Sequence, residues 1–192
     1  MKSNIILGLD IGGTGIKGAL VDVETGELVS ERVRYKTPFP AYPDAVAEKV
    51  QMLVAELKYD GDIIGCGFPA IVVNGVAKSA SNIHESWIDT SVEDILAKAT
   101  GKQVVVINDA DAAGVAEAYF GSMQSISGVS MLLTLGTGIG SALFVDGTLV
   151  PNTEFGHIHL KGQKLSLRNM LPMLSERRRS CCLLYTSDAA DE

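Results

Sequence analysis

The chain has 192 residues, of which 46% are hydrophobic and 20% are charged, and its formal net charge at pH 7 is −7. This composition is typical of a globular protein with enough apolar side chains for a sizeable core. An acidic chain without a basic stripe does not favour nucleic acid as a general partner, and no apolar run reaches the ~18 residues of a membrane span. We therefore expect a cytoplasmic protein that binds neither nucleic acid nor membranes.

The first distinctive feature is a glycine-rich stretch, Asp-Ile-Gly-Gly-Thr-Gly-Ile-Lys-Gly at residues 10–18, which directly follows an apolar run. Small residues let backbone N–H groups approach an anion, and threonine and lysine side chains can donate hydrogen bonds beside them. The stretch predicts a phosphate-binding turn formed by Asp10, Gly12, Gly13, Thr14, Gly15 and Lys17. Asp10 is in addition expected to be a magnesium ligand. A plain hairpin turn is the alternative.

The residues after this turn decide between possible phosphate-binding motifs. Residues 19–23 and 28–33 are β-type runs around a turn at 24–27, so the glycine stretch joins two antiparallel strands. A dinucleotide fingerprint would require a helix there, and the glycine spacing of a P-loop is absent. The pattern therefore favours a different type of phosphate site.

The middle of the chain alternates between helices and strands. Apolar residues recur at helical spacing from Ala45 to Lys58, with Asp44 as the expected N-cap. A short apolar strand is expected at 62–68, a strand running into a tight turn at 71–76, and a capped helix from Ser91 that ends at Gly101. This alternation predicts an α/β fold.

A buried β-branched strand is expected at 103–107, followed by Asn108-Asp109 and by a helix over 110–120. Loops at the carboxyl ends of parallel strands are the usual place for α/β active sites. Asn108 and Asp109 are therefore candidate site residues, although Asp109 could also serve as the N-cap of the helix.

The opening pattern returns near residue 131. An apolar strand at 131–135, the turn Gly136-Thr137-Gly138-Ile139-Gly140, a strand at 141–145 and the turn Asp146-Gly147 follow one another. This internal repeat predicts two related lobes, each of which offers backbone donors to one polyphosphate chain. Gly136, Thr137, Gly138 and Gly140 are the expected phosphate-binding residues of the second turn. A simple hairpin is again the alternative.

The end of the chain has a different character. Residues from about 164 onward show no clear periodicity, and the last ten residues resemble a translated adapter sequence. We expect the residues after about 163 to be non-native. The expected domains are an N-terminal lobe at 1–120, an incomplete start of a C-terminal lobe at 121–163, and a non-native tail at 164–192.

Six segments together resemble the sugar kinases of the ROK family, in particular its polyphosphate-using glucokinases. They lie in family order at residues 10–18, 67–72, 79–83, 108–113, 135–142 and 152–157. The resemblance implies an actin/hexokinase-like lobe of ribonuclease-H-like topology with a mixed sheet, followed by the start of a second such lobe. It also implies phosphoryl transfer to the 6-hydroxyl of glucose, and a parent protein that is a homodimer. The chain itself would be an inactive fragment.

The same resemblance implies roles for particular residues. Asp109 would act as the base toward the sugar hydroxyl, while Asn82, Asn108, Glu154 and His157 would bind other hydroxyls. The alternatives are purely structural roles: Asn82 as a turn residue, and Glu154 and His157 as a surface pair. Polyphosphate or ATP would be the phosphoryl donor and Mg²⁺ would bridge its phosphates, whereas no zinc is expected because nearby cysteines are missing.

Two other functions stay open at this point. One is an ATP-dependent kinase of another hexose, because hydroxyl contacts do not fix stereochemistry. The other is a non-catalytic sugar-binding protein of the same family, similar to its repressors but without their DNA-binding domain. A polyphosphate donor would favour a basic track, for which the candidates are Arg32, Arg34, Lys36 and Lys78.

Overall fold

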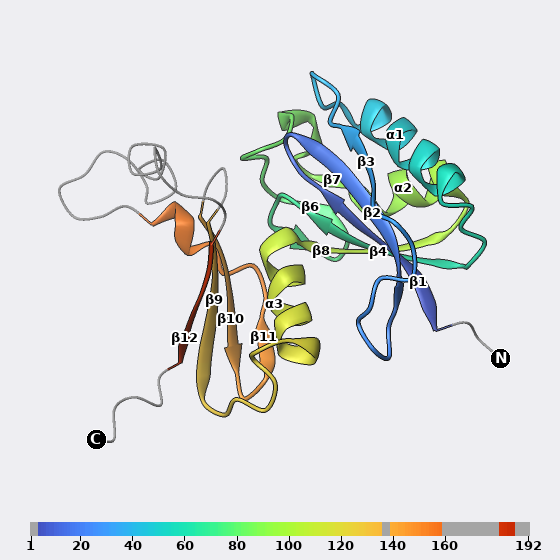
Figure 1. Ribbon diagram of the computed structural model, residues 1–192. Coiled ribbons are helices and arrows are strands. Elements are labelled where there is room, and N and C mark those ends of the chain that lie inside the picture. Colours follow the sequence, from blue (N-terminus) through green and yellow to red (C-terminus); the bar gives the residue numbers. More distant parts are fainter. Residues whose placement is uncertain (1–3, 136–138, 159–180, 187–192) are drawn as a thin grey trace, which may run out of the picture. The chain divides into compact units, whose positions relative to one another are not determined.

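The computed structural model describes residues 4–135 and 139–158, together with the backbone of residues 181–186. The chain divides into two compact units, residues 1–109 and residues 110–192 (Figure 1). In the described part of the chain, none of the helices has the length and apolar character needed to span a membrane. Each unit is built around its own sheet.

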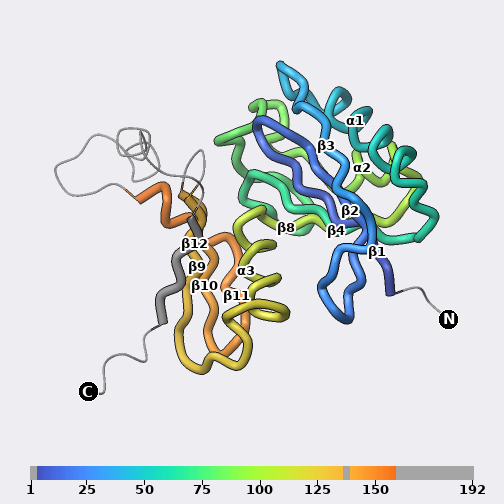
Figure 2. The backbone as a smooth tube through the Cα atoms, in the orientation of Figure 1, coloured from blue at the N-terminus to red at the C-terminus, as the bar shows by residue number. Residues whose placement is uncertain are grey.

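The first unit contains a five-stranded mixed sheet in the order β3-β2-β1-β4-β8. Its strands are β1 (Ile5–Ile11), β2 (Gly15–Asp22), β3 (Val33–Lys36), β4 (Ile63–Phe68) and β8 (Gln103–Asn108). The first three strands form an antiparallel meander, whereas β4 runs parallel to both β1 and β8. Figure 2 shows β1 between β2 and β4. The expected α/β class with a mixed sheet is confirmed.

Two helices, α1 (Pro43–Glu56) and α2 (Val92–Thr100), build the core of this unit with the sheet. The predicted Asp44 cap is wrong: Pro43 begins α1 and Tyr42 is its N-cap, without a side-chain cap bond, because proline suits a first turn whose N–H needs no partner. The prediction for α2 is confirmed. Ser91 Oγ accepts a hydrogen bond from the Asp94 N–H at 3.1 Å, and Gly101 ends the helix with φ +70°.

The expected strand at 28–33 is also wrong. Only an isolated bridge between Val21 and Leu28 forms there, and β3 begins at Val33. Ser30 Oγ accepts the Leu20 N–H at 2.9 Å, so a side chain replaces the ladder partner that β2 would otherwise need. The local sequence favoured a strand, but a serine hydroxyl satisfies the neighbouring backbone instead.

A small antiparallel sheet follows β4 in the chain. It comprises β5 (Val72–Val73), β6 (Val76–Ala77) and β7 (Thr90–Ser91), with the short 3₁₀ helix η1 (Glu85–Trp87) before β7. Asn74 and Gly75 both have positive φ, which two-residue hairpin turns of this type require. The predicted tight turn is therefore confirmed.

The second unit contains α3 (Asp109–Phe120) and a sheet in the order β11-β10-β9-β12. Its strands are β9 (Val129–Leu135), β10 (Ile139–Val145), β11 (Thr148–Val150) and β12 (Cys181–Thr186). A Cβ added to Gly114 would lie 2.6 Å from the Ala142 Cβ, so this glycine lets α3 lie close to β10. That packing is why residues 110–120, expected in the first lobe, cluster with the second sheet.

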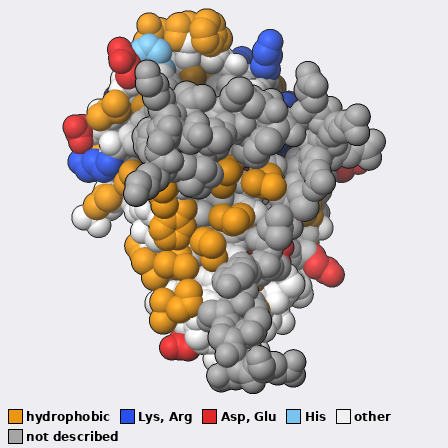
Figure 3. All heavy atoms as spheres, turned by 90° about the vertical axis from the view of Figure 1, so that its left-hand side faces the viewer, with side chains coloured by type: hydrophobic (Ala, Val, Ile, Leu, Met, Phe, Trp, Pro, Cys, Tyr) orange, Lys and Arg blue, Asp and Glu red, His pale blue; other side chains and the backbone are white. Residues whose placement is uncertain are grey.

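The second sheet is apolar on both faces. Leu132, Ala142 and Phe144 are buried together with residues of α3. The alternate positions face the other side, where Val129 and Val145 at the ends of β9 and β10 remain 44% and 42% exposed. Figure 3 views one face of the molecule and shows hydrophobic side chains exposed on it. The sheet therefore presents an apolar surface beyond the one that α3 covers.

Candidate active site

The glycine turn between β1 and β2 is held from two directions. Within the turn, the Gly12 N–H donates to the Gly15 carbonyl oxygen at 2.9 Å. From the end of β3, the buried Thr37 hydroxyl donates to the Gly12 carbonyl oxygen at 2.6 Å. A Cβ on Gly13 would lie only 2.6 Å from the Asn82 carbonyl oxygen, so residue 13 must be a glycine for this segment to approach. Hydrogen bonds thus hold the conformation of the turn, and the approach of Asn82 leaves no room for a side chain at residue 13.

Two charged side chains of the predicted phosphate site meet beside this turn. Lys17 Nζ lies 2.7 Å from Asp10 Oδ2, and both side chains are well exposed. An exposed pair of this kind contributes at most about 1 kcal/mol to stability. The Lys17 ammonium group can therefore leave the Asp10 carboxylate and bind an anion at low cost in free energy.

The described residues contain no group of three or more His, Cys, Asp or Glu side chains that could hold a metal ion. Mg²⁺ does not need such a group, because it usually keeps several waters and binds one or two carboxylates together with substrate phosphates. The exposed Asp10 carboxylate at the turn fits this donor set.

The parallel strands bring the acidic candidate to the same edge of the sheet as the glycine turn. Asp10 of β1 and Ile107 of β8 both lie level with Gly67 of β4. Because β1, β4 and β8 run in one direction, the turn after β1 and the residues after β8 lie at the same edge. Asp109, half-buried and first in α3, follows β8 directly.

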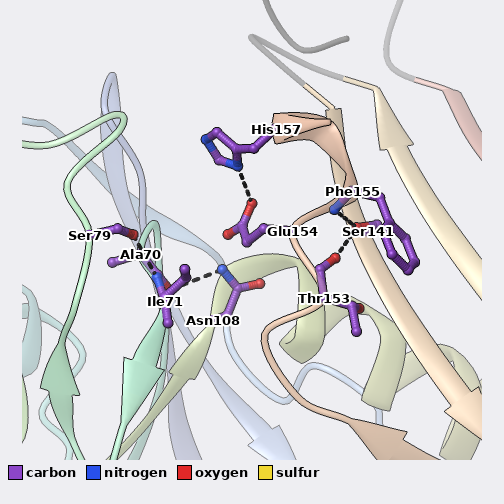
Figure 4. A network of polar contacts seen from close by, with 9 residues as sticks. All are labelled: Ala70, Ile71, Ser79, Asn108, Ser141, Thr153, Glu154, Phe155 and His157. Carbon is purple, nitrogen blue, oxygen red and sulfur yellow. Dashed lines mark hydrogen bonds and ion pairs between the residues drawn. The ribbon is translucent and has the colours of Figure 1, made fainter. Parts of the chain in front are cut away.

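Asn108 and Asn82 reach this edge by different routes. Asn108, the last residue of β8, is 3% exposed and donates from Nδ2 to the Ala70 carbonyl oxygen at 3.0 Å (Figure 4). This bond ties the end of β8 to the loop after β4. Asn82 is exposed, and its backbone lies against Gly13. The structure thus brings Asp10, the glycine turn, Asn82, Asn108 and Asp109 to one edge of the first sheet.

In the second unit, the other two predicted sugar ligands form a pair. His157 Nδ1 lies 3.1 Å from Glu154 Oε2, and the two side chains point toward one another in Figure 4. His157 belongs to the 3₁₀ helix η2 (Phe155–His157), and Glu154 is the residue before it. The Glu154 side chain is 20% exposed and that of His157 is 41% exposed, so both remain accessible to a small ligand.

Ser141 of β10 fixes the backbone on either side of Glu154. Its buried hydroxyl donates to the Thr153 carbonyl oxygen and accepts the Phe155 N–H at 3.0 Å (Figure 4). The flanking peptide groups are therefore held by one side chain of the sheet. Ser141 is the first residue of the strand predicted at 141–145, but the sequence did not indicate this role.

Asp111, in the first turn of α3, holds the same loop from the helix. Its Oδ2 accepts the Asn152 N–H at 2.7 Å, and the side chain is buried. Burial raises the pKa of the Asp111 carboxyl, the Asn152 N–H lowers it, and the nearby charge of Glu154 raises it, so that the net shift is upward. The helix that begins at Asp109 is thereby connected to the loop that carries Glu154.

The second glycine turn is described only in part. Gly136, Thr137 and Gly138, predicted to bind phosphate, lie outside the described residues. A Cβ on Gly140 would lie 2.5 Å from Thr134 Oγ1 and 2.9 Å from the Ala110 Cβ. Close packing under α3 therefore accounts for glycine at position 140.

The comparisons with known proteins match residues 6–183 to the ROK family. A polyphosphate glucokinase of Mycobacterium tuberculosis (strain CDC 1551 / Oshkosh) is 45% identical over 162 residues, which cover 84% of this chain and 61% of that protein. The chain therefore spans less than two thirds of this relative's length.

Among solved structures, the inorganic polyphosphate/ATP-glucomannokinase of Arthrobacter sp. strain KM is 46% identical, with a TM-score of 0.83 over 86% of this chain and 67% of that one. A ROK family glucokinase from Streptomyces griseus, solved with glucose and AMPPNP, is 31% identical with a TM-score of 0.72 over 81% of this chain and 51% of that one. Sequence and fold thus agree, and the chain belongs to the ROK family.

Proposed function

We propose that this chain carries the sugar site and one phosphate-binding turn of a glucokinase. The observation that supports this most is the common edge formed by the parallel strands β1, β4 and β8. The glycine turn and the Asn108-Asp109 pair both lie at this edge, where the parallel strands end. The related polyphosphate glucokinases and the polyphosphate/ATP-glucomannokinase support both the reaction and a polyphosphate or nucleotide donor.

In the proposed reaction, the 6-hydroxyl oxygen of glucose attacks the terminal phosphorus of the donor. The new O–P bond forms as the bond from phosphorus to the bridging donor oxygen breaks, and the shortened donor leaves with that oxygen. The carboxylate of Asp109 accepts the hydroxyl proton, and its main contribution is to position the nucleophile. Half-burial of Asp109 suits this role, because the carboxylate can be reached by a sugar and is shielded from bulk water.

The remaining candidates would bind the rest of the sugar and the donor. Glu154 and His157 offer an acceptor and a donor for neighbouring hydroxyls, and Asn82 and Asn108 offer mixed amide groups. The glycine turn and Lys17 would hold the phosphates of the donor. Asp10 would hold Mg²⁺, which when bound neutralises charge on those phosphates.

Formation of glucose 6-phosphate tests the proposal. The purified chain is incubated with glucose, Mg²⁺ and either polyphosphate or ATP, and Asp109→Asn is the matched variant. We expect the variant to lower kcat by about 10²- to 10⁴-fold, because asparagine keeps the shape of the side chain but cannot accept the proton. Circular dichroism checks that the variant is folded.

Glucose binding, measured by calorimetry without donor, provides a second readout. We expect binding that weakens in Asn108→Ala and persists in Asp109→Asn. A chain that binds no glucose and forms no product, or whose activity survives in Asp109→Asn, would contradict the proposed function.

A further inference from the structure

The first sheet carries several cations on the face that points away from α1 and α2. Leu9 and Ile11 belong to the core that those helices cover, so Asp10 between them lies on the opposite face of β1. Lys17 of β2 pairs directly with Asp10, and Arg34 of β3 pairs directly with Lys17. The three side chains form a row across three strands, a span of about 10 Å at the usual strand spacing.

Two further contacts direct this row toward the glycine turn. Lys36 of β3 pairs with Gly15, the glycine with which β2 begins. A Cβ on Gly15 would lie 2.9 Å from Arg34 Nε and 3.3 Å from Arg34 Nη2. The guanidinium group thus reaches diagonally across the ladder and lies over a glycine of the turn. Arg34 and Lys36 are both exposed, so an anion at the turn could contact them.

The arrangement is unfavourable for folding alone. Like charges directly opposite one another in a sheet are destabilising, and Lys17 faces Arg34 in this way. Asp10 compensates Lys17 at 2.7 Å, but among the residues that the structure describes neither Arg34 nor Lys36 forms an ion pair. The chain as a whole has a net charge of −7, so these cations form a local cluster of positive charge in an acidic protein. Such a local conflict is typical of a functional site.

We propose that Lys17, Arg34 and Lys36 form a track that binds an inorganic polyphosphate chain beyond the phosphoryl group that is transferred. This inference rests on the proposed function and specifies its donor. Successive phosphates repeat the same charge, so a row of cations that starts at the turn binds them without recognising a base. A nucleoside triphosphate has few phosphates beyond those that the turn itself holds, and it gains less from the row.

Other cations of the chain serve as a contrast. Lys78, also considered for such a track, is bound to Asp89 at 2.8 Å. Lys98, in the last turn of α2, is exposed, and α2 packs on the other face of the sheet. Lys98 therefore offers a matched control for the loss of one exposed positive charge.

The test compares Arg34→Gln, Lys36→Gln and the double variant with Lys98→Gln. KM is measured for long-chain polyphosphate and for ATP at saturating glucose. We expect the ratio of KM for polyphosphate to KM for ATP to rise about tenfold in the double variant, because two charge-assisted contacts are lost, and to stay unchanged in Lys98→Gln. The dependence of KM on salt should also become weaker, since exposed charges are screened.

Direct binding separates this inference from the proposed function. Calorimetry without glucose measures the affinity for long-chain polyphosphate and for tripolyphosphate. If the wild-type chain neither binds glucose nor forms glucose 6-phosphate, yet binds long polyphosphate about tenfold more tightly than the double variant, the track stands and the proposed function fails. Tripolyphosphate, whose few phosphates the turn itself would hold, should lose less affinity than long polyphosphate.

Two results would overturn the track. One is a double variant that binds long polyphosphate as tightly as the wild-type chain does. The other is an equal rise of KM for ATP and for polyphosphate, which would show a general effect on the phosphate turn instead of a track. Circular dichroism and the fluorescence of Trp87 show whether each variant remains folded.

Discussion

In the first sheet, β1 lies between the antiparallel strand β2 and the parallel strand β4, whereas in the second sheet β9 lies between two antiparallel strands, β10 and β12. In both units the first strand of the sheet pairs with the antiparallel strand that follows it, β2 in one and β10 in the other. The two sheets differ in the strand on the other side of that first strand, which is β4 beside β1 and β12 beside β9. A parallel neighbour requires a crossover connection, and in the first unit α1 lies within it.

The crossover has a large effect on the core. The first unit buries a cluster of 20 hydrophobic residues between its sheet and the helices α1 and α2. In the described part of the second unit, the corresponding cluster has four fully buried members, with further half-buried side chains around them. The comparison shows that a repeated hairpin motif does not by itself build a lobe. The helices that cover the sheet supply the second layer against which the apolar side chains of the strands are buried.

The largest expected difference between the units comes from their largest buried side chains. Trp87 is 0% exposed, packs on Phe68 and donates from Nε1 to the Ala41 carbonyl oxygen at 2.9 Å. We expect Trp87→Ala to lower the free energy of unfolding by about 3–5 kcal/mol. Phe144→Ala should cost less, because fewer buried neighbours surround this residue.

Hydrogen exchange, read separately for the two units, measures both effects. We expect each variant to reduce protection mainly in its own unit. An equal loss of protection in both units from either variant would show that the two sheets unfold together and that their cores are not independent.

A smaller effect is expected at Asp111, which ties the loop before Glu154 to α3. Asp111→Ala removes the acceptor of the Asn152 N–H and should cost about 1–3 kcal/mol. Asp111→Asn keeps an acceptor oxygen and should recover most of that loss. Urea denaturation followed by hydrogen exchange of residues 141–158 checks this order. Equal losses in the two variants would contradict a role for the hydrogen bond.

The same residue predicts a pH dependence. Because the pKa of Asp111 is raised above its ordinary value of 3.8, the folded chain holds the proton more tightly than the unfolded chain does. The stability that this provides is complete below the ordinary pKa and is lost as pH rises through the raised value. The stability of the wild-type chain relative to Asp111→Asn should therefore be largest below about pH 3.8 and fall as pH rises through the raised pKa. A constant difference would contradict the assigned shift.

The smallest effect compares two glycines in equivalent local situations. Gly101 ends α2 with φ +70° and Gly147 lies in the β10–β11 turn with φ +73°, and neither has an atom within 4 Å of an added Cβ. Alanine at either site should cost about 1 kcal/mol through backbone strain alone. Trp87 is the only tryptophan, so its fluorescence in urea should report Gly101→Ala and remain insensitive to Gly147→Ala. A shift of the fluorescence transition in both variants would link the two units.

Much of the fold could be predicted because the relevant signals are local. The Ser91 cap, the end of α2 at Gly101 and the tight turn at Asn74 and Gly75 depend only on neighbouring residues, and each prediction is confirmed. The prediction failed at Ser30, where a side-chain hydroxyl bonds a different strand. It also missed Thr37, Ser141 and Asp111, because their partners are far away in the sequence. The roles assigned to the candidate site residues stay predictions.

The sequence by itself determined most helices and strands of the first unit, the glycine turn between β1 and β2, and membership of the ROK family, since alternation, turn residues and ordered motifs can be read along the chain. Only the tertiary structure decided which strand lies beside β1 and β9, and which charges share a face of the first sheet. Strand register brings together residues that are distant in sequence, and side-chain packing across the sheet selects that register. The row of Asp10, Lys17 and Arg34 exists only once the three strands have paired.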